Sequence, residues 1–180
     1  MLLNARLIAE LFAWASLAVL CGLGSYKIAR TLFDHSSPGQ AQSASNSHRQ
    51  GDSAPVIYGL DYSKTNRTTV IAVSANCHFC LESMPFYARL AHAVSRRENT
   101  KLVLLFSDSA KEAAQFVKLA ELSDYMNRGL SVISGQDLAQ FDIAGTPTLF
   151  IVNRTGHIER IVRGKLPITK QSEILGIIAR

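Results

Sequence analysis

Two cysteines separated by two residues are the part of this sequence best suited to chemistry: Cys77-His78-Phe79-Cys80. They follow an apolar run at residues 70–73 and precede a stretch with helical spacing of apolar residues. A cysteine at the start of a helix lies beside unpaired backbone N–H groups and the positive end of the helix dipole, which can lower its pKa from about 8.5. We therefore expect Cys77 to be the nucleophilic thiolate. Cys80, one turn later, would resolve a mixed disulfide.

The rest of the chain from Pro55 onward alternates between strands and helices, as an α/β protein does. Apolar and β-branched runs predict strands at residues 56–60, 69–73, 101–107, 130–133, 148–153 and 157–163. Apolar residues near helical spacing predict helices at residues 81–97, 110–124, 136–141 and 168–179. The two cysteines then lie where a buried strand gives way to a helix.

Two further motifs make the cysteine pattern more specific. Pro85 lies five residues beyond Cys80, and the sequence G-T-P-T at residues 145–148 leads directly into an apolar strand. With the C-x-x-C, these motifs resemble the thioredoxin superfamily, and more narrowly its membrane-anchored disulfide reductases of the TlpA and ResA type. The resemblance covers about residues 55–180. It implies a thioredoxin-like α/β fold, with a central mixed β-sheet flanked by helices.

The resemblance also implies an activity and a binding surface. The activity is thiol-disulfide exchange with protein thiols and disulfides, with Cys77 and Cys80 as the catalytic pair. In this family the proline matching Pro147 is cis and lies against the active-site disulfide, so Thr146 and Pro147 would present their backbone to the partner's extended chain. Phe79 is a candidate apolar contact with that partner. No metal or organic cofactor is implied, and we expect a membrane electron-donor protein to supply the redox equivalents.

The sequence departs from the family pattern at two positions and has an unusual dipeptide between the cysteines. Asn76 stands where these proteins usually have tryptophan, and Ile71 stands where thioredoxin has a buried aspartate that takes part in proton transfer. No carboxylate can be assigned that role from the sequence. A protonated His78 would stabilise the Cys77 thiolate and make the pair more oxidising, so we expect His78 to tune its pKa. The change His78→Ala should raise the pKa of Cys77 and lower the reduction potential.

Redox chemistry is favoured over the other uses that two such cysteines can have. A structural disulfide or half of a zinc site is disfavoured, because no second cysteine pair exists and Cys21 lies in an apolar segment. Haem attachment would require histidine where Leu81 stands. A peroxiredoxin-like peroxidase finds its Ser or Thr in Ser74 but lacks the upstream proline. A binding or chaperone-like module without turnover is the alternative that the two departures permit.

The charge pattern gives no support to nucleic-acid binding. The net charge is +5, but the basic residues are spread over many segments without interleaved aromatic residues.

The amino-terminal part of the chain predicts a membrane anchor and a tether. Residues 7–26 are strongly apolar, and about 20 helical residues can cross a hydrocarbon core of about 30 Å. We expect a single-pass transmembrane anchor at residues 1–30, a flexible Ser- and Gln-rich linker at residues 31–54 and the catalytic domain at residues 55–180. A cleaved signal peptide is the main alternative to the anchor. By the resemblance, the catalytic domain faces the periplasm from the cytoplasmic membrane.

Overall fold

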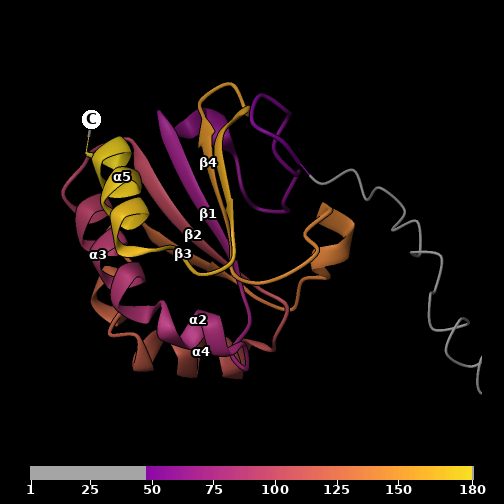
Figure 1. Cartoon of the computed structure of the whole chain (residues 1–180), viewed down its shortest axis with the longest axis vertical. Coiled ribbons are helices and arrows are strands. Elements are labelled where there is room, and N and C mark those ends of the chain that lie inside the picture. The colour runs from indigo at the N-terminus through magenta and orange to yellow at the C-terminus, as the bar shows by residue number, and fades with distance from the viewer. Residues whose placement is uncertain (1–47, 180) are drawn as a thin grey trace, which may run out of the picture. The chain divides into compact units, whose positions relative to one another are not determined.

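A computed structural model describes residues 48–179 of the chain. In this range five strands form one sheet in the order β3-β2-β1-β4-β5 (Figure 1). The strands are β1 (Arg67–Val73), β2 (Thr100–Phe106), β3 (Leu130–Ile133), β4 (Thr148–Asn153) and β5 (Ile158–Arg163). β1 pairs in parallel with β2, and β2 with β3, whereas β4 runs antiparallel to both β1 and β5. The predicted mixed β-sheet is confirmed.

The long helices gather on one face of this sheet (Figure 1). The helices are α2 (His78–Glu82), α3 (Met84–Ser95), α4 (Ala110–Leu119) and α5 (Ile168–Ile178), with 3-10 turns η1 (Tyr62–Lys64), η2 (Ser123–Tyr125) and η3 (Leu138–Phe141). Side chains of α3, α4 and α5 share one hydrophobic cluster with the sheet. The opposite face is covered by the segment before β1 and by η3. The α-helices therefore cover one face of the sheet, and mostly non-helical segments cover the other.

The central strand β1 explains why the run before the cysteines is apolar throughout. Ile71 and Val73 face the helices, whereas Val70 and Ala72 face the other cluster, and all four are at most 1% exposed. Successive side chains of a strand point to opposite faces, so a strand buried on both sides needs an uninterrupted apolar run. The loop that carries Cys77 therefore starts from a fully buried strand.

The strand predicted at residues 56–60 is wrong. Within residues 48–179 this segment pairs with no strand, and Leu60 N–H instead donates to the carbonyl of Ile57 at 3.0 Å. Ile57 is buried, but Val56 and Tyr58 are 90% and 95% exposed. The run is apolar, yet only Ile57 is fully buried in the core, with Leu60 packed partly against it. The segment at residues 56–60 therefore covers the sheet as a turn and does not add a strand to it.

The helix predicted at residues 81–97 is divided, and the one predicted at residues 110–124 is shorter. The first breaks at Ser83 between α2 and α3, and Pro85 lies in the first turn of α3. Proline has no N–H, so it cannot donate to the carbonyl four residues earlier and interrupts the helix there. α4 ends at Leu119, and Glu121 adopts a positive φ of 56° just beyond it.

Residues 48–54 lie alongside β5, although they belong to the stretch predicted as a linker. Gly51 N–H donates to the carbonyl of Ile158 at 2.8 Å, and Ile158 N–H donates to the carbonyl of Asp52 at 2.9 Å. Arg163 reaches back from the end of β5 and donates to the carbonyl of His48 at 2.6 Å. This pairing covers one edge of the sheet.

The predicted anchor at residues 1–30 and the linker up to residue 47 lie outside the described residues. Among residues 48–179, no helix combines the length and the apolar character needed to cross a membrane.

Candidate active site

The two cysteines differ sharply in exposure. Cys77 caps α2 with an extended backbone (φ −82°, ψ 116°), and its sulfur accepts the backbone N–H of Cys80 at 3.3 Å. Such an N-cap bond satisfies a donor that the helix itself leaves unpaired. Cys77 is half-buried, whereas Cys80 is 0% exposed, and both are thiols in this structure. One sulfur can therefore be reached from outside while the other lies behind it.

The surroundings of Cys77 lower its pKa. Burial is the largest single influence and opposes ionisation, but the hydrogen bonds around the sulfur together outweigh it. They come from the Cys80 thiol, the Thr146 side chain and the backbone N–H groups of Cys80 and Phe79. Hydrogen bonds to the charged form of a group favour ionisation, and the thiolate is the form of cysteine that attacks disulfides. The geometry thus favours Cys77 as the nucleophile.

The surroundings of Cys80 act in the opposite direction. Burial raises the pKa of Cys80 to about 12, and the neighbouring Cys77 adds to the rise. The backbone of Ser74 and the side chain of Thr146 oppose it only in part. Cys80 therefore keeps its proton when Cys77 ionises and can donate a hydrogen bond to the Cys77 thiolate.

The loop that enters β4 lies directly against the exposed sulfur. The Cys77 thiol donates to the carbonyl oxygen of Thr146 at 3.3 Å. The Thr146–Pro147 peptide bond is cis, and Pro147 is buried. The carbonyl of Pro147 accepts the N–H of Gly164 at 2.7 Å, just after β5. The structure thus brings Thr146 and Pro147, predicted from a distant motif, to the cysteine pair.

His78 lies on the outer side of α2, where its side chain is 76% exposed. Its Nε2 lies 3.3 Å from Oε1 of Glu82, and the other oxygen of Glu82 accepts Lys165 Nζ at 2.8 Å. The hydrogen bond from Lys165 is the main reason that the pKa of Glu82 is lowered, with a smaller contribution from His78. His78 therefore belongs to a surface charge cluster, and any influence on Cys77 acts through space.

Phe79 is the exposed apolar residue between the cysteines. Its side chain remains 53% exposed, and Leu81 in the next turn is 40% exposed. The ring of Phe79 lies 5.6 Å from the ring of His78. Exposed apolar side chains beside a reactive sulfur are available to contact a partner.

Asp108, which no sequence motif singled out, holds the loop before Cys77. Asp108 follows β2, and its Oδ2 accepts the backbone N–H of Ala75 at 2.9 Å. Its Oδ1 accepts the Ser74 hydroxyl at 3.2 Å. The sequence feature that could have indicated this role is the position of Asp108 at the carboxyl end of a strand parallel to β1. The carboxyl ends of parallel strands meet at one edge of a sheet. The Ser74 hydroxyl, singled out for a peroxidase, is engaged by this carboxylate.

Three solved structures share this architecture. The thioredoxin domain of a thiol-disulfide oxidoreductase from Bacteroides vulgatus is 17% identical, with a TM-score of 0.57 over 74% of this chain and 100% of that chain. A candidate thiol:disulfide interchange protein DsbE from Chlorobium tepidum is 19% identical, with a TM-score of 0.55 over 74% and 99%. A secreted disulfide oxidoreductase from Mycobacterium tuberculosis, homologous to E. coli DsbE, is 16% identical, with a TM-score of 0.51 over 65% and 84%.

The chain has a thioredoxin-like fold. This confirms the fold that the C-x-x-C, Pro85 and G-T-P-T motifs predicted. No protein-family profile matches the sequence, and no curated protein matches it either.

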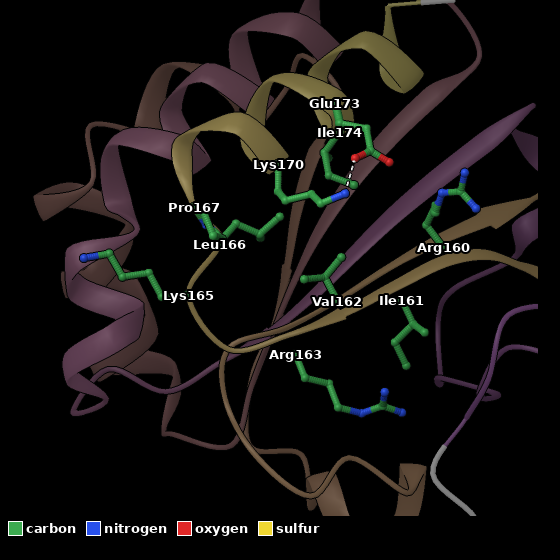
Figure 2. Close-up of a pocket in the computed structure, with 10 residues that line it drawn as sticks. All are labelled: Arg160, Ile161, Val162, Arg163, Lys165, Leu166, Pro167, Lys170, Glu173 and Ile174. Atoms are coloured by element: carbon green, nitrogen blue, oxygen red, sulfur yellow. Dashed lines mark hydrogen bonds and ion pairs between the residues drawn. The ribbon is translucent and has the colours of Figure 1, made fainter.

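A separate cavity of about 320 Å³ lies between β5 and α5 in the thioredoxin-like domain (Figure 2). Its floor is apolar and its rim carries cations, among them Arg160 and Lys170, the latter paired with Glu173 at 2.8 Å. Neither cysteine lines it. Lys165 at its rim points to α2, where it bonds Glu82. Among residues 48–179, no three His, Cys, Asp or Glu side chains gather closely enough to hold a metal ion.

Proposed function

We propose that this protein is a membrane-anchored thiol-disulfide oxidoreductase that reduces disulfides of extracytoplasmic partner proteins. The observation that carries the proposal is the asymmetry of the pair: Cys77 is accessible with a lowered pKa, and Cys80 is buried with a raised one. This asymmetry fits a nucleophile and a resolving thiol, because the first must ionise before the second.

The reaction follows from these two states. The Cys77 thiolate attacks one sulfur of the partner's disulfide, forming a mixed disulfide and releasing the other sulfur as a thiolate. Cys80 then loses its proton and attacks Cys77, which releases the second partner sulfur. The partner leaves as a dithiol, its two sulfurs taking up two protons, while Cys77 and Cys80 become a disulfide. A dithiol of a membrane electron-donor protein returns two electrons and two protons to the pair.

Residues around Cys77 would bind the partner during this exchange. Thr146 and Pro147 approach the sulfur from the β4 side, where their backbone is available to an extended chain. Phe79, between the two cysteines, offers exposed apolar surface. Both features support a protein rather than a small-molecule substrate.

The proposed location is the outer side of the cytoplasmic membrane. It rests on the apolar residues 7–26, which would form the anchor, and on the polar residues that follow them. The structural neighbour from Mycobacterium tuberculosis is described as secreted, which agrees with an extracytoplasmic domain. Alkaline phosphatase fused to the carboxyl terminus should be active in a bacterial host. An inactive fusion would reverse this topology.

Insulin reduction by the purified protein tests the activity. We expect catalysis that disappears in Cys77→Ser. The reduction potential then gives the direction, because a value near −270 mV, about that of thioredoxin, fits a reductase and one near about −120 mV fits an oxidant. A wild type without turnover would instead favour a binding or chaperone-like module, which Asn76 and the buried Ile71 permit.

A further inference from the structure

The buried hydroxyl of Tyr87 has no explained role in the core. Tyr87 is 2% exposed, and no described residue forms a hydrogen bond with its hydroxyl. A buried polar group without a partner costs free energy, so native cores contain few of them. A phenylalanine would fill the same space without that cost.

The position of Tyr87 relates it to Cys80. Cys80, Ser83 and Tyr87 follow each other at spacings of three and four residues, which places them on one side of a helical segment. The backbone stays helical through the break, because Ser83 N–H donates to Cys80 (3.2 Å) and Tyr87 N–H donates to Ser83 (3.1 Å). All three are buried, at 0%, 4% and 2% exposure.

The electrostatic surroundings agree with this placement. Burial is the main reason that the pKa of Tyr87 is raised, and the next influence is the negative charge of an ionised Cys80. The hydroxyl thus lies within electrostatic reach of the resolving sulfur and keeps its proton at neutral pH. The Ser83 side chain opposes the rise in part. Its hydroxyl proton is donated to the carbonyl of Phe79 at 2.7 Å, so only its oxygen is left to accept a bond.

Other charged groups lie farther out. On the helices that pack around the Tyr87 ring, the remaining charged side chains are exposed or half-exposed: Arg89, His92, Lys111, Glu112 and Lys118. Asp108 at the end of β2 is bound to the loop before Cys77. The side chain of Ile71 on β1 is apolar and offers no hydrogen bond.

We propose that Tyr87 is a positioning residue for the resolving step: its hydroxyl donates a hydrogen bond, directly or through one water molecule, to the Cys80 sulfur as that sulfur becomes a thiolate. Tyr87 keeps its proton throughout. The Cys80 proton leaves to solvent or to the departing partner thiolate, and the Cys77–Cys80 bond forms as the bond from Cys77 to the partner breaks. This inference rests on the proposed function, because it assigns Cys80 as the resolving thiol.

The two steps can be separated with one equivalent of 5,5′-dithiobis(2-nitrobenzoate) and the full chain carrying Cys21→Ser. Attack by Cys77 releases one thionitrobenzoate, and attack by Cys80 on the resulting mixed disulfide releases the second. We expect Tyr87→Phe to leave the first phase unchanged and to slow the second about tenfold, since a hydrogen bond to a charged group is worth about one pKa unit or more. Plots of log rate against pH for the second phase should run parallel for the wild type and Tyr87→Phe at all pH values below the Cys80 pKa.

Tyr62→Phe is the matched control. Its hydroxyl is part-buried and donates to the carbonyl of Pro55 at 2.9 Å, before β1. It should leave both phases unchanged. A second phase unaffected by Tyr87→Phe, or equal slowing of both phases, overturns the proposal and leaves the redox pair intact. A wild type that releases only one equivalent overturns the proposed function itself.

Discussion

Asp108, just after β2, accepts the backbone N–H of Ala75 at 2.9 Å and thereby joins the ends of two parallel strands. The second carboxylate oxygen accepts the Ser74 hydroxyl, so both oxygens hold the loop that leads to Cys77. The Ser74 carbonyl in turn accepts the N–H of Cys77 at 3.2 Å. The position of the nucleophile therefore depends on a carboxylate more than thirty residues away in the sequence.

Removing this carboxylate should loosen the loop. We expect Asp108→Ala to lower the free energy of unfolding by about 1–2 kcal/mol, because two hydrogen bonds to a half-buried charged group are lost. Urea unfolding followed by circular dichroism measures this. The alkylation rate of Cys77 should also differ less between the folded and the unfolded variant than it does in the wild type. Asp108→Asn keeps one oxygen acceptor, so its stability should lie between those of the wild type and Asp108→Ala. Asp124→Ala, a change at an exposed position, should resemble the wild type.

Cys80 makes the reduced protein sensitive to alkaline pH. Its pKa in the folded protein is about 12, whereas an unfolded thiol has a pKa of about 8.5. Between these values the unfolded chain releases a proton that the folded chain retains, so stability falls as pH rises, by up to about 1.4 kcal/mol per pH unit. Cys77 has the opposite sign, because its lowered pKa adds stability that is complete above about pH 8.5.

The window from about pH 8.5 to about pH 9.5 reports mainly on this effect, because tyrosines in unfolded chains, with a pKa of about 10, are still mostly protonated there. We expect the urea midpoint of the reduced wild type to fall across this window. The midpoint of Cys80→Ala should change less, although this variant starts from a lower stability because of its cavity. If the urea midpoints of the two proteins fell by the same amount across this window, the raised pKa of Cys80 would be contradicted.

The sequence predicted most of the sheet and the approach of residues 145–148 to the cysteines, because periodicity and a family resemblance carry that information. It did not predict the exposed turn at residues 56–60, since a short apolar run does not reveal whether a partner strand is present. Asp108 was missed for a similar reason: its role depends on which strands are neighbours. The cis state of the Thr146–Pro147 bond came from the resemblance alone, since either isomer fits the same residues.

The charge cluster on α2 should modulate Cys77 only weakly. Because His78 is exposed and contacts Glu82, we expect His78→Ala to slow alkylation of Cys77 at pH 7 by about threefold at low salt. The sign follows because a protonated imidazole near a thiolate would stabilise it, and alanine cannot. Glu82→Gln removes the negative charge and should accelerate the same reaction. Added salt should reduce both effects, and an unchanged pKa and potential in His78→Ala would remove His78 from the mechanism.

The pairing of residues 48–54 with β5 predicts where the stable domain begins. A fragment that starts at residue 55 loses the backbone bonds at Ile158, the bond from Arg163 to the His48 carbonyl and the contact of the His48 ring with Phe150. We expect it to be less stable than a fragment starting at residue 48 by roughly 1–3 kcal/mol, because each net hydrogen bond contributes about 0.5–1.5 kcal/mol and ordering the segment offsets part of the gain. Chemical unfolding of the two fragments measures the difference. Equal stabilities would mean that this segment adds nothing to the fold and that the domain begins at Pro55, as the composition alone predicts.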